Sequence, residues 1–483
     1  MSSVKKNLSL QTAYRVLSVC MPLITAPYLA RRLGVEQLGV FSFTTSVVAY
    51  FTLAAMLGTV NYGTRTIASV KGDRIRRDEA FSAIFLFQLA MTLAATAAYL
   101  VYLQFFCTSN RLIAWLQGVA LLSCLVDINW LFFGVEDFQI TVTRSMVIKI
   151  LSVILILVVV RQQSDLWKYT LIMLGSTFLS NLILFAYLPR YASLRRVSMA
   201  QIRAHIGPNL ILFIPLLAMT VYHTMDKTML GLLSNFEQSG FYYNSDKVVQ
   251  IPLVIINGVG TVMLPRMSSL LAENQQEEAD RLFMTTMEGI AVVCIALACG
   301  IAAVAKEFIP FFFGKGYDPC ILITIVFSPI LLIKGFSSIV RTQYLIPMKM
   351  EKEFTISVIG GAVVNLILNL LLIPRHGALG AAAATVIAEL AACVLQFFSL
   401  RGRALGIGRL LLKTLQYLLI GLAMAALVRL TAQVQIGVVW KLVLEILVGA
   451  GFFTIACTVF WARSGNGMFD LFCRPILRRL KRR

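Results

Sequence analysis

Long apolar runs, separated by short polar stretches, make up most of this chain. A helix needs about 20 apolar residues to cross the hydrocarbon core of a bilayer, which is about 30 Å thick. Fourteen runs reach that length, and each predicts a membrane-spanning helix. Their predicted ranges are 8–30, 40–63, 80–106, 112–134, 144–163, 166–189, 206–233, 241–265, 282–305, 320–345, 354–374, 378–400, 409–432 and 438–463. We therefore expect an all-α polytopic membrane protein with about 14 transmembrane helices.

Composition agrees with this prediction and excludes a soluble protein. Hydrophobic residues are 58% and charged residues 14% of the 483 residues, whereas soluble domains carry about 25% charged residues. That is too little charge to cover the surface of a soluble chain of this length. The nine cysteines include no C-x-x-C pair, and His205, His223 and His376 lie far apart. Neither a disulfide framework nor a metal site is predicted, and no cofactor is expected.

The distribution of positive charge predicts how the chain is oriented in the membrane. Lys and Arg number 43 against 23 Asp and Glu. They are concentrated in alternate loops, such as Lys71–Arg77, and in the tail from Arg474. Cytoplasmic loops carry such an excess, so both termini are predicted to be cytoplasmic. A nucleic-acid-binding arm is the alternative interpretation of the tail, but contact with anionic lipid headgroups is simpler, and no nucleic-acid partner is expected.

No catalytic pattern is recognisable in the sequence. It has no G-x-x-x-x-G-K-[ST] phosphate loop, no H-E-x-x-H and no G-x-S-x-G. A membrane enzyme such as a polysaccharide polymerase or ligase would need a long outward loop, and the longest predicted one, 306–319, has only four charged residues. We therefore expect a transporter that works by rearranging its helices, and not an enzyme.

Two turns about 200 residues apart predict an internal repeat. Residues 33–41 read LGVEQLGVF and residues 233–241 read LSNFEQSGF, each after a proline-containing apolar helix. Transporters are commonly built from two related halves with the substrate site at their interface. The prediction is an N-terminal six-helix bundle over 1–205, a pseudo-symmetric six-helix bundle over 206–400, and two further helices with a basic tail over 401–483.

Four segments carry distinctive residue combinations. They are PYLARRLG at 27–34, WLFFGVEDF at 130–138, DKTMLG at 226–231 and IPRHGALGAA at 373–382. In order and spacing they resemble the Wzx-type polysaccharide flippases of the multidrug/oligosaccharidyl-lipid/polysaccharide exporter superfamily. The resemblance implies two six-helix bundles around a central cavity that opens alternately to either side of the membrane.

The resemblance also implies a substrate. It is an undecaprenyl-pyrophosphate-linked oligosaccharide that moves from the inner to the outer leaflet of the bacterial plasma (inner) membrane. Implied partners are membrane lipids, polysaccharide assembly proteins, and H⁺ or Na⁺ as coupling ion. The alternative on the same fold is a cation-coupled multidrug or small-metabolite antiporter, which would be expected to favour acidic residues in its cavity.

Basic residues in or beside the spans are the candidates for substrate binding. A charge at the bilayer centre costs about 2.5–3.5 kcal/mol on insertion scales, so it tends to face a cavity or a partner. An anionic pyrophosphate headgroup favours cations, and Arg can bind phosphate oxygens with two parallel hydrogen bonds. The predicted substrate-binding residues are Arg15, Arg31, Arg32, Arg65 and Lys334.

Each of these residues also has a structural interpretation. Lys334, near the centre of its span, would form a buried ion pair. Arg15 would extend to the inner interface, and Arg31 and Arg32 would contact outer headgroups. Arg65 would be an orientation signal.

Carboxylates within spans are the candidates for ion coupling, because buried carboxylates can exchange protons near neutral pH. The predicted residues are Asp127, Asp226 and Glu389. Glu389 follows a run of small residues from Ala378 that permits close helix packing, so a hydrogen bond across a tight interface is the first interpretation there. Prolines such as Pro22 and Pro27 permit either gating movements or static kinks.

Overall fold

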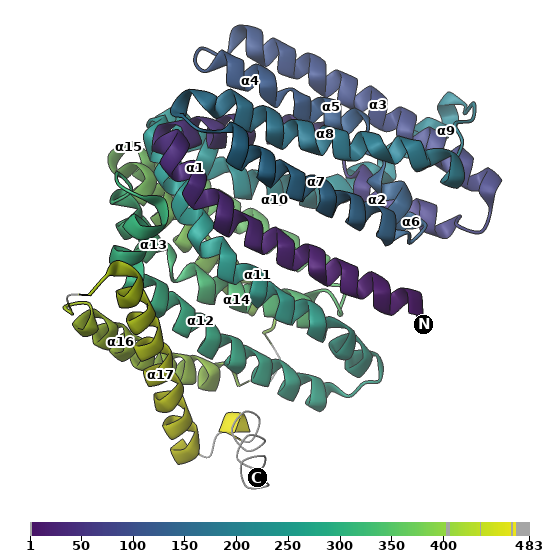
Figure 1. Cartoon of the computed structure of the whole chain (residues 1–483). Helices are drawn as coiled ribbons and strands as arrows, with labels where there is room; N and C mark the ends of the chain where they lie inside the picture. The colour runs from purple at the N-terminus through teal and green to yellow at the C-terminus, as the bar shows by residue number, and fades with distance from the viewer. Residues whose placement is uncertain (1, 402–405, 435, 465–466, 470–483) are drawn as a thin grey trace. The chain divides into compact units, whose positions relative to one another are not determined.

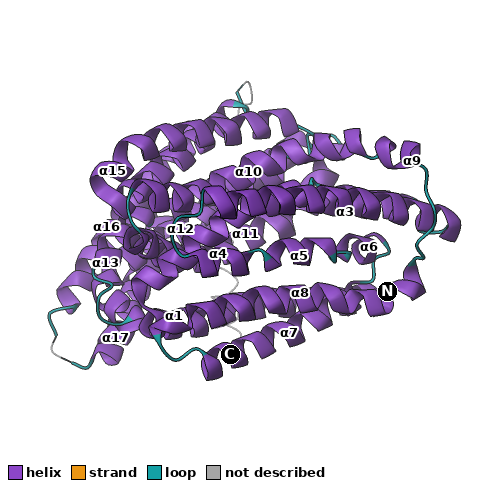
Figure 2. Cartoon of the chain, turned by 90° about the horizontal axis from the view of Figure 1, so that it is seen from above, coloured by secondary structure: helices purple, strands orange, loops and turns teal. Residues whose placement is uncertain are grey.

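The computed structural model consists of helices and short connections (Figure 1). It describes residues 2–401, 406–434, 436–464 and 467–469, without the side chains of residues 2–16, 19, 20, 215 and 261. No strand occurs within these residues (Figure 2). The predicted all-α fold class is therefore confirmed.

Two glycine kinks explain how the helices relate to the predicted spans. Eleven helices are long and apolar enough to cross a membrane, or twelve if a bent pair over 199–233 is one span. Helix α1 (Ser2–Met56) contains a kink at Gly34, and α15 (Glu351–Phe398) contains one at Gly377. The φ angles there, 79° and 52°, lie in the left-handed region that favours glycine. Each long helix thus holds two predicted spans, which accounts for the difference from fourteen.

Met1–Tyr243 form one compact unit. Its helices after α1 are α2 (Thr59–Ser69), α3 (Arg74–Phe105), α4 (Arg111–Gln117), α5 (Val119–Leu125), α6 (Asn129–Gly134), α7 (Phe138–Val159), a 3₁₀ turn (Gln163–Asp165), α8 (Leu166–Tyr191), α9 (Met199–Ala204) and α10 (Ile206–Leu233). Helix α1 is central, because it packs against α3, α7 and α10.

Asn244–Arg483 form the second unit. Its elements are most of α11 (Phe236–Ala272), α12 (Gln276–Phe313), α13 (Pro319–Phe327), α14 (Ile330–Val340), a π-helix (Arg341–Leu345), α15, α16 (Ile407–Thr431) and α17 (Val438–Ser464). Helix α12 packs against α14, α16 and α17. The two units of the structure meet after Tyr243, so α10 belongs to the first unit, whereas the predicted boundary lies before α10. The predicted ranges 1–205, 206–400 and 401–483 stay a prediction.

The predicted span 112–134 is not one helix but three, α4, α5 and α6. Irregular backbone at membrane depth is tolerated only where protein groups satisfy it. Here the Gln88 side chain of α3 donates to the carbonyl oxygens of Cys124 (2.7 Å) and Asp127 (2.9 Å). The Asn181 amide of α8 donates to the Ser123 carbonyl oxygen (3.2 Å). Hydropathy did not reveal this break, because the segment Arg111–Gly134 as a whole is apolar enough to cross a membrane despite Asp127 and Asn129 at the break.

The segment WLFFG forms α6 and lies in the core of the first unit. Trp130, Leu131 and Phe132 are fully buried. Two glycines permit the approach of α2: a Cβ on Gly63 would lie 2.6 Å from the Trp130 ring, and one on Gly134 would lie 2.6 Å from the Ile67 side chain. This segment is therefore part of the packing of α2 on α6.

The two turns of the predicted repeat lie against each other within the first unit. A Cβ on Gly39 would lie 1.7 Å from the Phe236 carbonyl oxygen, and one on Gly240 would lie 2.0 Å from the Val35 carbonyl oxygen. Any side chain would collide with backbone, so both positions require glycine. This close approach explains why the two turns share a glycine.

Candidate functional site

The second unit brings two predicted site residues together. Lys334 of α14 and Glu389 of α15 form an ion pair, with Nζ 2.9 Å from Oε1. Their side chains are 19% and 9% exposed. The structural interpretation of Lys334 as an ion-pair partner is thus realised, and Glu389 makes an ion pair across a helix interface. Their roles in transport stay predictions.

Asp226 is buried in the DKTMLG segment of α10. Its Oδ2 accepts a hydrogen bond of 2.5 Å from the hydroxyl of Tyr242 in α11. The next residue, Lys227, places its ammonium group 5.8 Å from the centroid of the Tyr243 ring. Thr228 donates to the hydroxyl of Ser46 in α1 at 2.9 Å. The segment thus connects α10 to both α1 and α11 through polar contacts.

Asp127 lies at the break between α5 and α6. Its Oδ1 accepts hydrogen bonds from the backbone N–H (3.0 Å) and the side-chain amide (2.7 Å) of Asn129. Asn129 in turn accepts from Arg144 of α7 (3.1 Å) and donates to Asn181 of α8 (3.0 Å). The carboxylate therefore stabilises the start of α6 within a network across three helices. Arg144 was missed from sequence because it begins a predicted span, where a basic residue is ordinary.

Three basic candidates of the first unit, Arg31, Arg32 and Arg65, are exposed. Arg31 and Arg32 precede the kink of α1, and the Arg32 guanidinium lies 5.7 Å from the centroid of the Tyr28 ring. Arg65 is exposed on α2 and has no hydrogen bond or ion pair within the described part of the chain. The side chain of Arg15 lies outside the described residues; its backbone belongs to α1.

A buried polar network that the sequence did not predict connects α12, α16 and α17. Glu288 of α12 accepts from the ammonium of Lys413 (2.8 Å) and from the hydroxyl of Tyr417 (2.6 Å). The indole N–H of Trp461 donates to the same hydroxyl (2.9 Å). Glu288 and Lys413 are 125 residues apart, so no local sequence pattern joins them.

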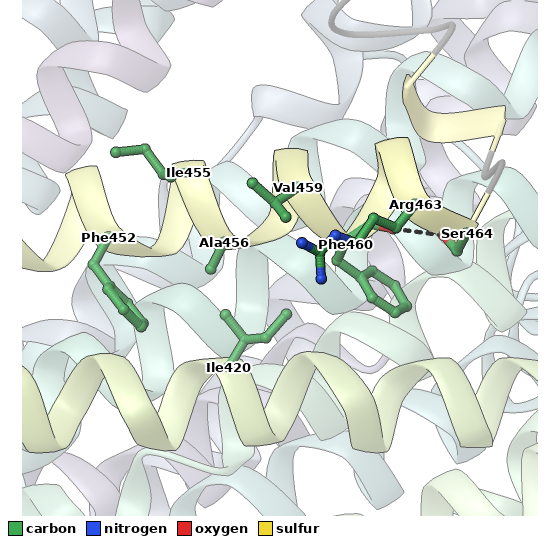
Figure 3. A pocket seen from close by; sticks show the side chains of 8 residues that line it. All are labelled: Ile420, Phe452, Ile455, Ala456, Val459, Phe460, Arg463 and Ser464. Atoms are coloured by element: carbon green, nitrogen blue, oxygen red, sulfur yellow. Dashed lines mark hydrogen bonds between the residues drawn. The ribbon is translucent and has the colours of Figure 1, made fainter.

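An apolar groove of about 650 Å³ lies between α16 and α17 (Figure 3). Ile420 lines it from α16, and Phe452, Ile455 and Val459 line it from α17. Arg463, near the end of α17, is the one charged residue among the side chains that line it. The groove therefore combines an apolar surface with a cation at one end, and this combination is complementary to an amphiphile with an anionic headgroup.

These features define a multi-pass membrane protein in which several buried charges are held in pairs and networks between helices. Its fold is similar to that of the lipid II flippase MurJ in an inward closed conformation, with a TM-score of 0.74 and 15% identity over 95% of this chain and 99% of that one. A multidrug resistance MATE family transporter of the MOP superfamily, in an inward-facing conformation, matches with a TM-score of 0.61 and 12% identity over 83% of this chain and 95% of that one.

Sequence relatives agree with this class. A protein of Escherichia coli (strain K12) named as an O-antigen transporter is 21% identical over 385 residues, which is 79% of this chain and 92% of that protein. A Haloferax volcanii protein named as a low-salt glycan biosynthesis flippase is 24% identical over 176 residues, 34% of this chain and 35% of that protein.

Two family descriptions cover more than half of the chain each. The polysaccharide biosynthesis protein family matches residues 4–271, and the lipid II flippase MurJ family matches residues 142–450. The chain belongs to the polysaccharide biosynthesis protein family and is a Wzx-type flippase of the multidrug/oligosaccharidyl-lipid/polysaccharide exporter superfamily. The predicted family is thereby confirmed, and the relatives are transporters and flippases rather than enzymes.

Proposed function

We propose that this protein moves undecaprenyl-pyrophosphate-linked oligosaccharide from the inner to the outer leaflet of a bacterial plasma membrane, by alternating access, for cell-surface polysaccharide biosynthesis. The observation that carries this proposal is the likeness to a lipid II flippase over 95% of the chain, together with the family match. The names of the two sequence relatives favour a glycan cargo. Both termini lie in the cytoplasm under this proposal.

The charges and the groove fit such a cargo. A lipid-linked sugar has an anionic headgroup, which needs cations while it leaves water, and a long apolar tail, which stays in hydrocarbon. Arg65 is exposed and lacks a partner within the described residues, so its guanidinium is available to phosphate. The apolar groove between α16 and α17 offers a surface for the tail, with Arg463 at its end (Figure 3). In this proposal Arg15, Arg31 and Arg32 assist Arg65.

The proposal assigns conditional headgroup binding to Lys334 and ion coupling to three carboxylates. Lys334 binds the headgroup only when its pair with Glu389 opens. Asp127, Asp226 and Glu389 bind the coupling ion, H⁺ or Na⁺, since each carboxylate is held by a donor that can exchange partners during a rearrangement. A carboxylate that loses its donor in low dielectric gains a proton or a cation instead.

The test is flipping of a fluorescent undecaprenyl-pyrophosphate oligosaccharide in proteoliposomes. The intact protein is expected to flip it, and Arg65→Ala to slow flipping about tenfold or more, because a hydrogen bond to a charged group contributes about 1.5–3 kcal/mol. Arg76→Ala is the matched control, since Arg76 is also exposed and, within the described residues, its side chain pairs with exposed Asp73. Normal flipping by the Arg65→Ala variant would remove Arg65 from the substrate path.

A cation-coupled antiporter is the second candidate, because the fold is also similar to a multidrug resistance transporter. It predicts efflux of cationic dyes driven by a proton or sodium gradient, without lipid flipping under any gradient. That result would replace the flippase proposal.

A further inference from the structure

The buried face of α17 contains a carboxylate that accepts no hydrogen bond within the described residues. This face is formed by residues at helical spacing, Leu442, Glu445, Gly449, Phe453, Cys457 and Trp461, and it packs against α12 and α16. Glu445 is fully buried, with 0% of its surface exposed. Within the described part of the chain, neither of its carboxylate oxygens has a hydrogen-bond partner. Every other residue of this face except Trp461 is apolar or small.

The neighbouring charges are already engaged by another carboxylate. Glu307 of α12 binds Arg429 of α16 through Oε2 (2.7 Å) and Lys441 of α17 through Oε1 (3.5 Å). Glu445 lies close enough to interact electrostatically with all three. These four residues form a charged cluster between three helices, with Glu307 on α12, Arg429 on α16, and Lys441 and Glu445 on α17. Both cations pair with Glu307, and within the described residues Glu445 forms no ion pair.

An ionised carboxylate in this position is costly. Burying a charge without an ion-pair partner is unfavourable even after relaxation of the protein, whereas a neutral carboxylic acid avoids most of that cost. A metal cation would need several oxygen ligands, and the residues beside Glu445 on this face of α17 supply none. A proton needs no coordination shell, so it is the ligand that the site fits.

We propose that Glu445 is a proton-binding site, and that release of its proton is linked to an exchange of ion pairs between α12 and α17. When the carboxylic O–H bond breaks, the proton leaves to solvent and Glu445 becomes negative. Lys441 lies one helical turn before Glu445, at the i, i+4 spacing of a helical ion pair. It is also the more distant partner of Glu307, so it is the cation that changes partner. Glu307 then keeps Arg429 alone.

Infrared spectroscopy of the purified protein in lipid membranes tests this directly, and the test does not depend on the proposed cargo. The difference spectrum between neutral and alkaline pH is expected to show loss of a carboxylic-acid C=O band and gain of carboxylate bands. Glu445→Gln is expected to lack this band entirely. Glu288→Gln is the matched control on α12: Glu288 is also buried but is bound by Lys413 and Tyr417, so the band is expected to stay.

A second variant tests the exchange of partners. Glu307→Gln frees Arg429 and Lys441, so Glu445 is expected to pair with them and to lose its proton, and the band is expected to be absent already at neutral pH. A band that survives in Glu445→Gln overturns the site, and a band unaffected by Glu307→Gln overturns the exchange. Glutamine mimics the neutral acid, so failure of Glu445→Gln to fold would also contradict the proposal.

Discussion

The ammonium group of Lys334 lies 2.9 Å from the carboxylate of Glu389, so two residues chosen from the sequence for different tasks form one ion pair. Each was expected to need a partner because charge inside a membrane span is costly. Their pairing means that a change at either residue acts on the other. Effects of single substitutions at these positions therefore combine a structural and a transport contribution, which have to be separated.

Lys334→Ala is expected to lower the stability of the second unit. Removing one partner of a buried ion pair typically costs about 3–5 kcal/mol, because the other charge stays buried and uncompensated. Replacing both residues, as in Lys334→Met with Glu389→Leu, is expected to cost less than the single change. Thermal unfolding in detergent measures both. Equal stability of Lys334→Ala and the intact protein would contradict the pair.

Exchanging the charges of Lys334 and Glu389 separates their contribution to stability from their contribution to transport. Lys334→Glu combined with Glu389→Lys preserves the ion pair but moves its positive end from α14 to α15. Stability is expected to recover to within about 1 kcal/mol of the intact protein, in the range of tolerated polar exchanges. If Lys334 also binds the headgroup, flipping in proteoliposomes stays low despite the recovered stability. Full recovery of flipping would assign a purely structural role to the pair.

Gly39→Ala and Gly240→Ala are expected to disrupt the first unit. The new Cβ would lie 1.7 Å and 2.0 Å from backbone carbonyl oxygens, which cannot move without shifting a helix. Overpacking in a close-packed interior costs about 1–3 kcal/mol or more. Gly175→Ala in α8 is the control, because its Cβ would meet nothing within 4 Å. Size-exclusion chromatography of the expressed variants reports the folded yield, and a control-like yield for Gly39→Ala would disprove the close approach.

Gln88→Leu is expected to destabilise the break between α5 and α6. The substitution removes the donor to the carbonyls of Cys124 and Asp127 and the acceptor of the Trp130 indole N–H (2.9 Å). Each buried polar group left unsatisfied costs about 1–3 kcal/mol. Gln104→Leu, an exposed position of the same helix, is expected to leave the melting temperature unchanged. Identical melting temperatures for the two variants would argue against this role of Gln88.

Tyr417→Phe is expected to weaken the attachment of α16 and α17 to α12. The lost hydroxyl joins Glu288 to the Trp461 indole, and a hydrogen bond to a charged group contributes about 1.5–3 kcal/mol. The indole N–H would lose its partner, so tryptophan emission is expected to shift along with the melting temperature. Tyr102→Phe in the first unit serves as the comparison. An unchanged spectrum and melting temperature would show that the hydroxyl is dispensable.

Hydropathy predicted most of the helices, but not the interruptions within them. The predicted span 206–233 coincides with α10, and 438–463 nearly coincides with α17. The span 112–134 became three helices because Gln88 and Asn181, distant in sequence, supply the hydrogen bonds that a break requires. Such donors come from other helices, so a local window of hydropathy does not contain them.

The candidate site was predictable as a set of residue types. Charge within apolar spans singled out Lys334, Asp226, Asp127 and Glu389, because charges in hydrocarbon need a compensating group. Arg144, Lys413 and Glu307 acquired their significance only from the side chains that face them.

Apolar length and the distribution of charge are properties of neighbouring residues, and they were enough to establish a polytopic helical membrane protein with charged residues that require partners. Which partner each charge received was decided by the packing of helices. Lys334 and Glu389 lie 55 positions apart in the chain and 2.9 Å apart in the fold. The energy of an ion pair depends on the distance between the two charges in space, and only the packing of α14 against α15 fixes that distance.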